Sequence, residues 1–235
     1  MRRVLTLLVS FTFICILGCG NRYQHRMDVT LERMREAKRL DDNLMPPPSE
    51  GKLKELAIYV RPPKNMERAK QFQLTAVPPG LFDAEETFFE GNKDFLHILA
   101  RQKTAKKAAT KKGAPAVEQT PRGDFAADVS NLLAGVFGDP ELVAPGKFKD
   151  ESQKTNKFRR AVFKANNKNV SVYFYKADPY DVALVFLVDP ADQAALVTKI
   201  GLTLQSFAVG SKAKAKYDGA GSDEEAEAEA GVGAF

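Results

Sequence analysis

The sequence predicts an α+β fold, in which helices pack on a mainly antiparallel sheet. Three strand-length segments, residues 157–165, 169–176 and 181–188, follow one another with only short breaks between them. The breaks, "NNKN" and "ADPY", are typical of hairpin turns, which join antiparallel neighbours. Segments with apolar residues at helical spacing stand before and after the three strands. This order favours a single domain at residues 53–210, preceded by a helical stalk and followed by a disordered tail.

The N-terminus has the pattern of an export signal. Arg2 and Arg3 precede the uncharged residues 4–17, a run shorter than the ~20 residues that a spanning helix needs. A basic head, a short apolar stretch and a small residue at its end are typical of a secretory signal peptide, which we expect to cover residues 1–18. An uncleaved N-terminal anchor is the alternative.

The end of this stretch, "ILGC" at residues 16–19, resembles the lipobox of bacterial lipoprotein precursors. The resemblance implies that cleavage follows Gly18 and that Cys19 carries the lipid. It therefore implies a chain that is tethered to a membrane of the cell envelope and faces the periplasm. In that family, Gly at the position of Gly20 goes with the outer membrane rather than the inner one. The only other cysteine, Cys15, would leave with the signal peptide, so we expect no disulfide in the exported chain.

Residues 19–52 are expected to form the lipid anchor and a helical stalk. Its apolar residues recur at helical spacing and form one face, which is a candidate surface for a partner helix: Met27, Leu31, Met34, Leu40 and Leu44. Three consecutive prolines, Pro46 to Pro48, end the helix. The apolar face can dock on the chain's own domain or on a partner protein, and the sequence leaves both open.

The first part of the domain contains three expected strands. Residues 53–61 and 70–76 precede a proline-rich turn, and residues 94–101 form the third strand. The acidic residues between them, Asp83, Glu85 and Glu86, are expected in a solvated loop. His97 alternates with apolar residues, so we expect it to be a partly buried core residue.

A basic segment interrupts the domain at residues 102–122. It is rich in Lys, Ala and Thr and poor in bulky apolar residues, which predicts a flexible linker. The basic side chains of this region are candidates for contact with anionic lipid headgroups, although its composition favours a solvated linker: Arg101, Lys103, Lys106, Lys107, Lys111 and Lys112. The net charge of +5 is unevenly placed, and aromatic residues do not alternate with these basic ones, so we expect no nucleic-acid partner.

The second part of the domain begins with a helix at residues 125–137, with Asp124 as its N-cap and Gly138 as its C-cap. The three strands follow, and the last of them, "VALVFLV", is apolar on both faces, which predicts a central strand covered on both sides. A helix from Asp189 to Gly210 completes the domain, and residues 211–235 are a low-complexity tail. The topology of this part resembles the helix-over-antiparallel-sheet modules of envelope assembly lipoproteins and PsbP-like proteins.

The sequence carries no motif of a catalytic or metal site. It has no GxSxG motif, and its two histidines, His25 and His97, lack zinc-site spacing, so we expect no metal and no cofactor. The leading hypothesis is a non-catalytic, membrane-anchored envelope lipoprotein that binds an envelope protein as an interaction or assembly accessory domain. One alternative is a ligand carrier with a cavity between sheet and helices. The other is a carboxylate-dependent hydrolase, because such carboxylate pairs cannot be recognised from sequence.

Overall fold

The computed structural model describes residues 2–103, 123–138, 147–177 and 180–219. The chain divides into two compact units, Met1–Asp42 and Asn43–Phe235. The first unit is the long helix α1 (Arg2–Asn43), which ends before the three prolines, as predicted. No helix in the described part of the chain is both long enough and apolar enough to span a membrane.

The second unit is built on an antiparallel sheet of seven strands in the order β2-β3-β4-β8-β7-β6-β5. In chain order the strands are β2 (Glu67–Arg68), β3 (Ala84–Glu90), β4 (Asp94–Gln102), β5 (Lys149–Gln153), β6 (Asn156–Ala165), β7 (Lys168–Ala177) and β8 (Tyr180–Val188). Every neighbouring pair is antiparallel. The predicted fold class is therefore confirmed.

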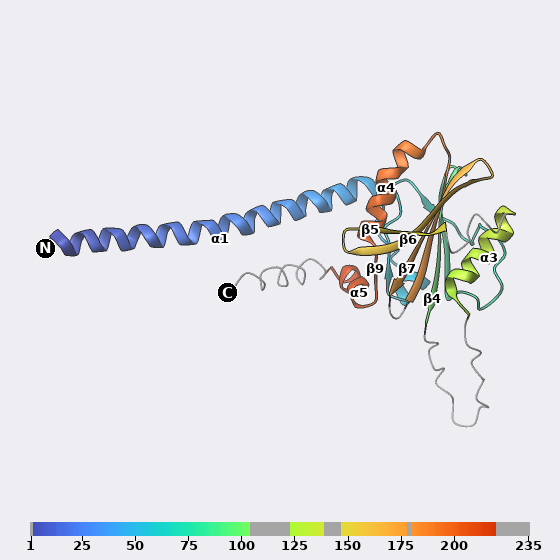
Figure 1. The fold of residues 1–235 in the computed structure, drawn as a ribbon, viewed down its shortest axis with the longest axis horizontal. Helices are drawn as coiled ribbons and strands as arrows, with labels where there is room; N and C mark the ends of the chain where they lie inside the picture. The colour runs from blue at the N-terminus through green and yellow to red at the C-terminus, as the bar shows by residue number, and fades with distance from the viewer. Residues whose placement is uncertain (1, 104–122, 139–146, 178–179, 220–235) are drawn as a thin grey trace, which may run out of the picture. The chain divides into compact units, whose positions relative to one another are not determined.

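Helices cover both faces of this sheet (Figure 1). On one face, α3 (Phe125–Phe137) buries Val129 and Leu133 against side chains of β7 and β8. On the other face, α4 (Gln193–Ser206) buries Leu196, Ile200 and Leu204. Strand β8 lies between the two layers and contributes alternate residues to each core cluster, which confirms the prediction of a central strand covered on both sides.

A two-stranded sheet lies beside the main one. It pairs β1 (Ile58–Tyr59) with β9 (Ala208–Val209), next to the short helices α2 (Lys52–Glu55) and α5 (Ser211–Tyr217). Ala213 of α5 is fully buried, and the Tyr217 hydroxyl donates a hydrogen bond to the Ile58 carbonyl at 2.9 Å. The predicted tail therefore starts too early, because residues 211–217 pack on the domain. Residues 220–235 lie outside the described part of the chain.

The predictions for the second half of the domain are largely confirmed. Strands β6, β7 and β8 and helix α3 lie where the sequence predicts them. The Asp124 side chain accepts a hydrogen bond from the Ala126 N–H, and Gly138 closes the helix at φ 74°, a left-handed conformation that suits glycine. Two predictions about α4 were wrong. Asp189 caps a turn before the helix by accepting from the Ala191 N–H, and the helix ends at Ser206, before Gly210.

The predictions for the first half were less accurate. Only residues 58–59 of the first expected strand pair with another strand, and residues 70–76 form no strand. Phe72 and Leu74 pack as irregular chain against the α3-side cluster instead. The expectation of an acidic loop was wrong for Glu85 and Glu86, which lie in β3, whereas Asp83 precedes the strand. Glu86 has a charge partner inside the sheet. Its Oε1 accepts a hydrogen bond from Arg68 Nη2 at 2.8 Å.

Candidate functional site

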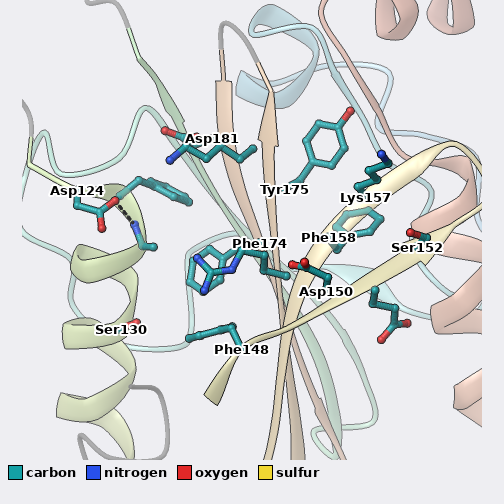
Figure 2. A pocket seen from close by; sticks show the side chains of 15 residues that line it. Asp124, Ser130, Phe148, Asp150, Ser152, Lys157, Phe158, Phe174, Tyr175 and Asp181 are labelled. Atoms are coloured by element: carbon teal, nitrogen blue, oxygen red, sulfur yellow. Dashed lines mark hydrogen bonds between the residues drawn. The ribbon is translucent and has the colours of Figure 1, made fainter. Parts of the chain in front are cut away.

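A cavity of about 540 Å³ lies between the first turn of α3 and the ends of strands β5, β6 and β7 (Figure 2). This volume falls in the range of small-molecule and peptide side-chain pockets, about 300–1,000 Å³. The lining combines aromatic and charged side chains: Asp124, Phe125, Ala126, Ser130, Phe148, Asp150, Glu151, Ser152, Lys157, Phe158, Arg159, Phe174, Tyr175, Lys176 and Asp181. No local motif in the sequence predicts this cavity, because its residues come from five separate segments.

The aromatic rings of the lining pack on one another. Phe148 and Phe174 have ring centroids 4.9 Å apart in an edge-on arrangement, and Phe125 meets Phe174 at 6.2 Å. On the other face of the sheet, Phe158 lies 5.4 Å from Tyr175. Rings held by such contacts form a preorganised apolar surface on both faces of the sheet at this point.

The cavity lies where β6 and β7 separate. Their ladder ends at the pair Arg159–Phe174, although β6 starts at Asn156 and β7 continues to Ala177. Extending the ladder would set Lys157 directly opposite Lys176, and like charges in that position destabilise a sheet. Residues 175–177 therefore pair with β8 on one side only.

Asn156 holds the start of β6 away from β7. Its buried side chain donates from Nδ2 to the carbonyls of Leu204, at 2.9 Å, and Phe207, at 2.7 Å. These carbonyls lie at the C-terminal end of α4, where helical carbonyls lack a partner within the helix. Phe158 also contacts the end of α4, because its ring lies 5.9 Å from the ring of Phe207. The separation of the strands is thus fixed by contacts with α4.

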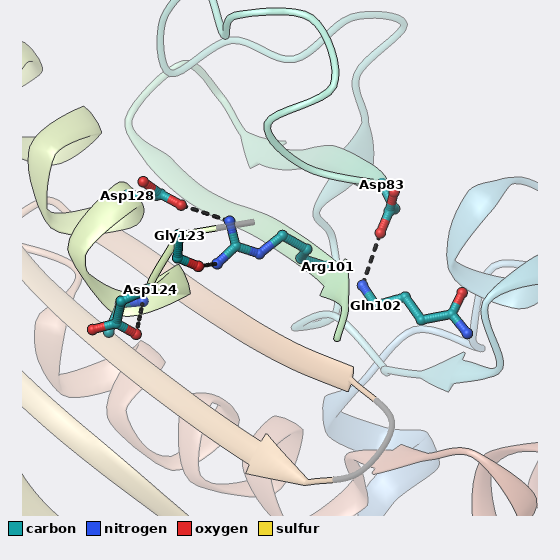
Figure 3. A network of polar contacts seen from close by, with 7 residues as sticks. Asp83, Arg101, Gln102, Gly123, Asp124 and Asp128 are labelled. Carbon is teal, nitrogen blue, oxygen red and sulfur yellow. Dashed lines mark hydrogen bonds and ion pairs between the residues drawn. The ribbon is translucent and has the colours of Figure 1, made fainter. Parts of the chain in front are cut away.

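Arg101 positions α3, which forms the opposite wall (Figure 3). From β4, its guanidinium donates to Asp128 Oδ2 at 2.5 Å and to the Gly123 carbonyl at 2.6 Å. It also lies 5.2 Å from the centroid of the Phe125 ring. The three contacts fix the first turn of α3 against the sheet, and with it the Asp124 and Phe125 side chains that line the cavity.

Most of the carboxylates in the lining take part in structural contacts. Asp124 caps α3, Glu151 accepts from Arg160 at 2.9 Å, and Asp181 lies 3.8 Å from Lys103. Within the described residues, neither Lys157 nor Lys176 forms an ion pair within 4 Å. Lys176 lies opposite Asp181 in the β7–β8 ladder, whereas Lys157 lies opposite Ser152 and faces no carboxylate across the sheet. A hydrolase with paired carboxylates stays a prediction that these contacts do not favour.

The structure corrects part of the predicted anionic-surface contact. Arg101 is 5% exposed and bound to α3, so its assignment to a lipid-contacting surface was wrong. Lys103 is partly exposed and lies near Asp181. The other four residues of that group, Lys106, Lys107, Lys111 and Lys112, lie outside the described residues, as does most of the expected linker.

The predicted partner face of the stalk is largely exposed. The exposed fractions are 46% for Met27, 44% for Leu31 and 64% for Met34, while Leu40 is partly buried. The prediction was wrong for Leu44, which follows the end of α1 and is only 2% exposed. Leu44 forms an isolated antiparallel β-bridge with Pro63. Tyr23, which was not among the residues predicted for this face, is 69% exposed and continues it.

The remaining predicted positions concern chemistry. His97 is a core residue, as expected, with Nδ1 at 2.9 Å from the Thr87 hydroxyl, and burial lowers its pKa to about 4. Among the side chains that the structure describes, no cluster of His, Cys, Asp or Glu could hold a metal ion. Gly18 and Cys19 lie within α1, and lipidation of Cys19 stays a prediction.

Comparison with known proteins identifies no family. No family model and no curated protein matches the sequence. Among solved structures, cyanobacterial PsbP (CyanoP) from Synechocystis sp. PCC 6803 shares 10% identity at a TM-score of 0.40, over 66% of this chain and 88% of that one. A protein from Bacteroides thetaiotaomicron VPI-5482 shares 8% identity at a TM-score of 0.37, over 65% of this chain and 45% of that one. Likenesses at this level carry no argument about function.

Proposed function

We propose that this chain is a membrane-tethered protein of the bacterial cell envelope that binds other proteins and has no catalytic activity of its own. One observation carries the proposal. From residue 23 onward, among the side chains whose exposure the structure describes, six large apolar ones are exposed, and four of them lie on α1: Tyr23, Met27, Leu31 and Met34. Exposed apolar side chains gathered on one surface are typical of protein interaction sites.

The spacing of these four residues places them on one side of the helix. They are separated by four, four and three residues, the intervals at which helical side chains lie above one another. Full burial of each such side chain contributes roughly 1.5–3 kcal/mol. A partner that covers the face with its own apolar surface would gain enough from these four residues for specific binding, as in helix-in-groove recognition.

The proposed tether sets which proteins can reach this face. A lipid on Cys19 would hold the chain at the membrane. An α-helix rises 1.5 Å per residue, so Tyr23 to Met34 would lie within roughly 25 Å of the lipidated residue along the helix. This distance favours a partner that is itself a membrane or envelope protein.

Paired substitutions on α1 test the proposal. Leu31→Asp with Met34→Asp places two charges on the apolar face. His25→Asp with Val29→Asp places two charges on the opposite side of the same helix and serves as the matched control. We expect the first pair to abolish co-purification of cross-linked envelope proteins with the full chain, and the control pair to preserve it.

The melting temperature distinguishes an apolar face that binds a partner from one that packs on the chain's own domain. If the first pair lowers the melting temperature of the full chain and leaves co-purification unchanged, the apolar face packs on the chain's own domain and the proposal is wrong. An unchanged melting temperature together with lost co-purification supports it.

The cavity between α3 and the sheet favours a second candidate, a ligand carrier. Its volume and aromatic lining suit a small molecule with an apolar body. Native mass spectrometry of the full chain, purified in mild detergent, tests this candidate. A carrier should retain a bound mass that Ser152→Trp, a change at the lining, displaces. A spectrum that contains only the chain and its lipid would contradict the carrier function.

A further inference from the structure

We propose that the cavity where β6 and β7 separate binds an extended peptide segment of a partner protein, which pairs with residues 175–177 of β7 as an added strand. This inference rests on the proposed protein-binding function, and it specifies a second contact and the conformation of the bound segment. The occupant that we infer has a bulky apolar residue at its centre and an acidic residue beside it.

The backbone of β7 lacks a neighbouring strand on one side at residues 175–177. Residues 175–177 pair with β8 on one side, but the ladder with β6 has already ended at Phe174. Backbone N–H and C=O groups are strong hydrogen-bonding groups, and an unpaired strand edge is a template for another strand. The side of β7 that β6 leaves uncovered is also where the cavity lies, because Tyr175 and Lys176 line it.

The side chains around this edge suit an extended segment. Successive residues of a strand point to opposite faces of the sheet, so an added strand needs apolar surface on both faces. Phe174 belongs to the α3-side cluster, whereas Tyr175 packs with the α4-side cluster. Phe148 widens the first surface and Phe158 the second. A bulky apolar side chain of the segment therefore finds aromatic rings on whichever face it occupies.

The charges at the rim favour an acidic residue in the segment. The carboxylates of Asp124 and Glu151 already accept hydrogen bonds within the domain. Lys176 lies opposite Asp181 of β8, whereas Lys157 lies opposite Ser152 of β5 and forms no ion pair within the described residues. A carboxylate of the added segment would pair with Lys157, the one of these two cations that faces no carboxylate across the sheet.

The separation of the strands is built into the fold. Asn156 ties the start of β6 to the end of α4, and Arg101 fixes α3 on the other side. Both contacts are made by side chains that are at most 8% exposed. The site is therefore preorganised, which lowers the entropic cost of binding a short segment.

Peptide selection on the full chain tests the inference. The probe is a display library of random dodecapeptides, selected on the detergent-solubilised chain. Ser152→Trp, which fills the cavity from β5, is used for counter-selection. Val162→Trp places the same side chain on an exposed position of β6 outside the lining and is the matched control. We expect peptides that bind the wild-type chain and Val162→Trp equally and bind Ser152→Trp at least tenfold more weakly.

N-methylation of the peptide backbone then distinguishes binding by strand pairing from binding through peptide side chains alone. In an added strand only every second amide faces β7, so N-methylation should weaken binding about tenfold at alternate positions and little at the positions between them. Amide hydrogen exchange at residues 175–177 should slow when the peptide binds. The inference is overturned if no sequence is selected against Ser152→Trp, or if the effect of N-methylation does not alternate.

The co-purification assay with Leu31→Asp and Met34→Asp shows whether this inference and the proposed function fail independently. If no peptide binds the cavity while co-purification still depends on Leu31 and Met34, only the strand-addition inference fails. If a peptide binds with the alternating pattern while no envelope protein co-purifies, strand addition is supported and the proposed contact through α1 fails.

Discussion

Acid should destabilise this domain through a single buried histidine. His97 is 2% exposed, its Nδ1 lies 2.9 Å from the Thr87 hydroxyl, and the rings of Phe72 and Phe95 flank it. Burial disfavours the imidazolium and lowers the pKa from 6.5 to about 4. We predict that replacing His97 with Phe, which preserves the ring contacts, removes a pH-dependent part of the stability.

The sign and the size follow from proton linkage. The folded pKa lies below the unfolded one, so the contribution is fully present above pH 6.5 and is lost as the pH falls toward 4. At about 1.4 kcal/mol for each pKa unit, the loss between pH 7 and pH 4 is at most about 3 kcal/mol. Burial raises the pKa of Glu85, Glu86 and Asp94, which acts in the opposite direction and is shared by the wild type and the variant.

Urea unfolding at a series of pH values from 7 to 4 measures this contribution. The quantity of interest is the free energy of unfolding of the wild type minus that of His97→Phe, because the shared carboxylates cancel in this difference. We expect the difference to fall by about 3 kcal/mol over this range. A difference that stays constant from pH 7 to pH 4 would show that the histidine is protonated as readily in the folded state as in the unfolded state, and would refute the argument from burial.

Three further predictions concern the walls of the cavity and the tether. Arg101→Met should cost about 1–3 kcal/mol, because it leaves Asp128 and the Gly123 carbonyl without their donor. The melting temperature should fall by several degrees, and an equal melting temperature would contradict the assigned role. Asn156→Ala should cost a similar amount, since two carbonyls at the end of α4 lose their donor. Urea unfolding measures this cost, and an unchanged midpoint would contradict it. Cys19→Ser should abolish metabolic labelling with palmitate, and equal labelling of the two chains would exclude the lipoprotein assignment.

The sequence predicts the second half of the domain well because local signals there agree with the tertiary structure. Strands β6 to β8 are joined by short turns of typical composition, and the core residues of β8 are apolar on both faces. The first half departs from such local rules. Strand β3 contains three acidic residues, and Glu86 is tolerated within it because Arg68 comes from the neighbouring strand. That pairing is visible only in three dimensions.

The cavity could not be predicted for the same reason. Arg101 belongs by sequence to a basic segment, yet it is buried because Asp128, 27 residues later, receives it. Asn156 stands in a polar turn, and its partners lie about 50 residues further along the chain. A pattern search that considers only neighbouring residues assigns the first to a charged surface and the second to a loop. Side-chain spacing on α1, in contrast, is a local property, and the sequence predicts that Met27, Leu31 and Met34 share one face of the helix.

Site-specific photo-cross-linking in intact cells tests the central claim most directly. A photoreactive amino acid is placed at Leu31, on the apolar face of α1, and in a second chain at Val29, on the opposite side. Binding of an envelope protein by the apolar face predicts a cross-link to a distinct protein from position 31 and little from position 29. Cross-links from position 31 that map back to the chain's own domain, or equal cross-linking from the two positions, would contradict the account.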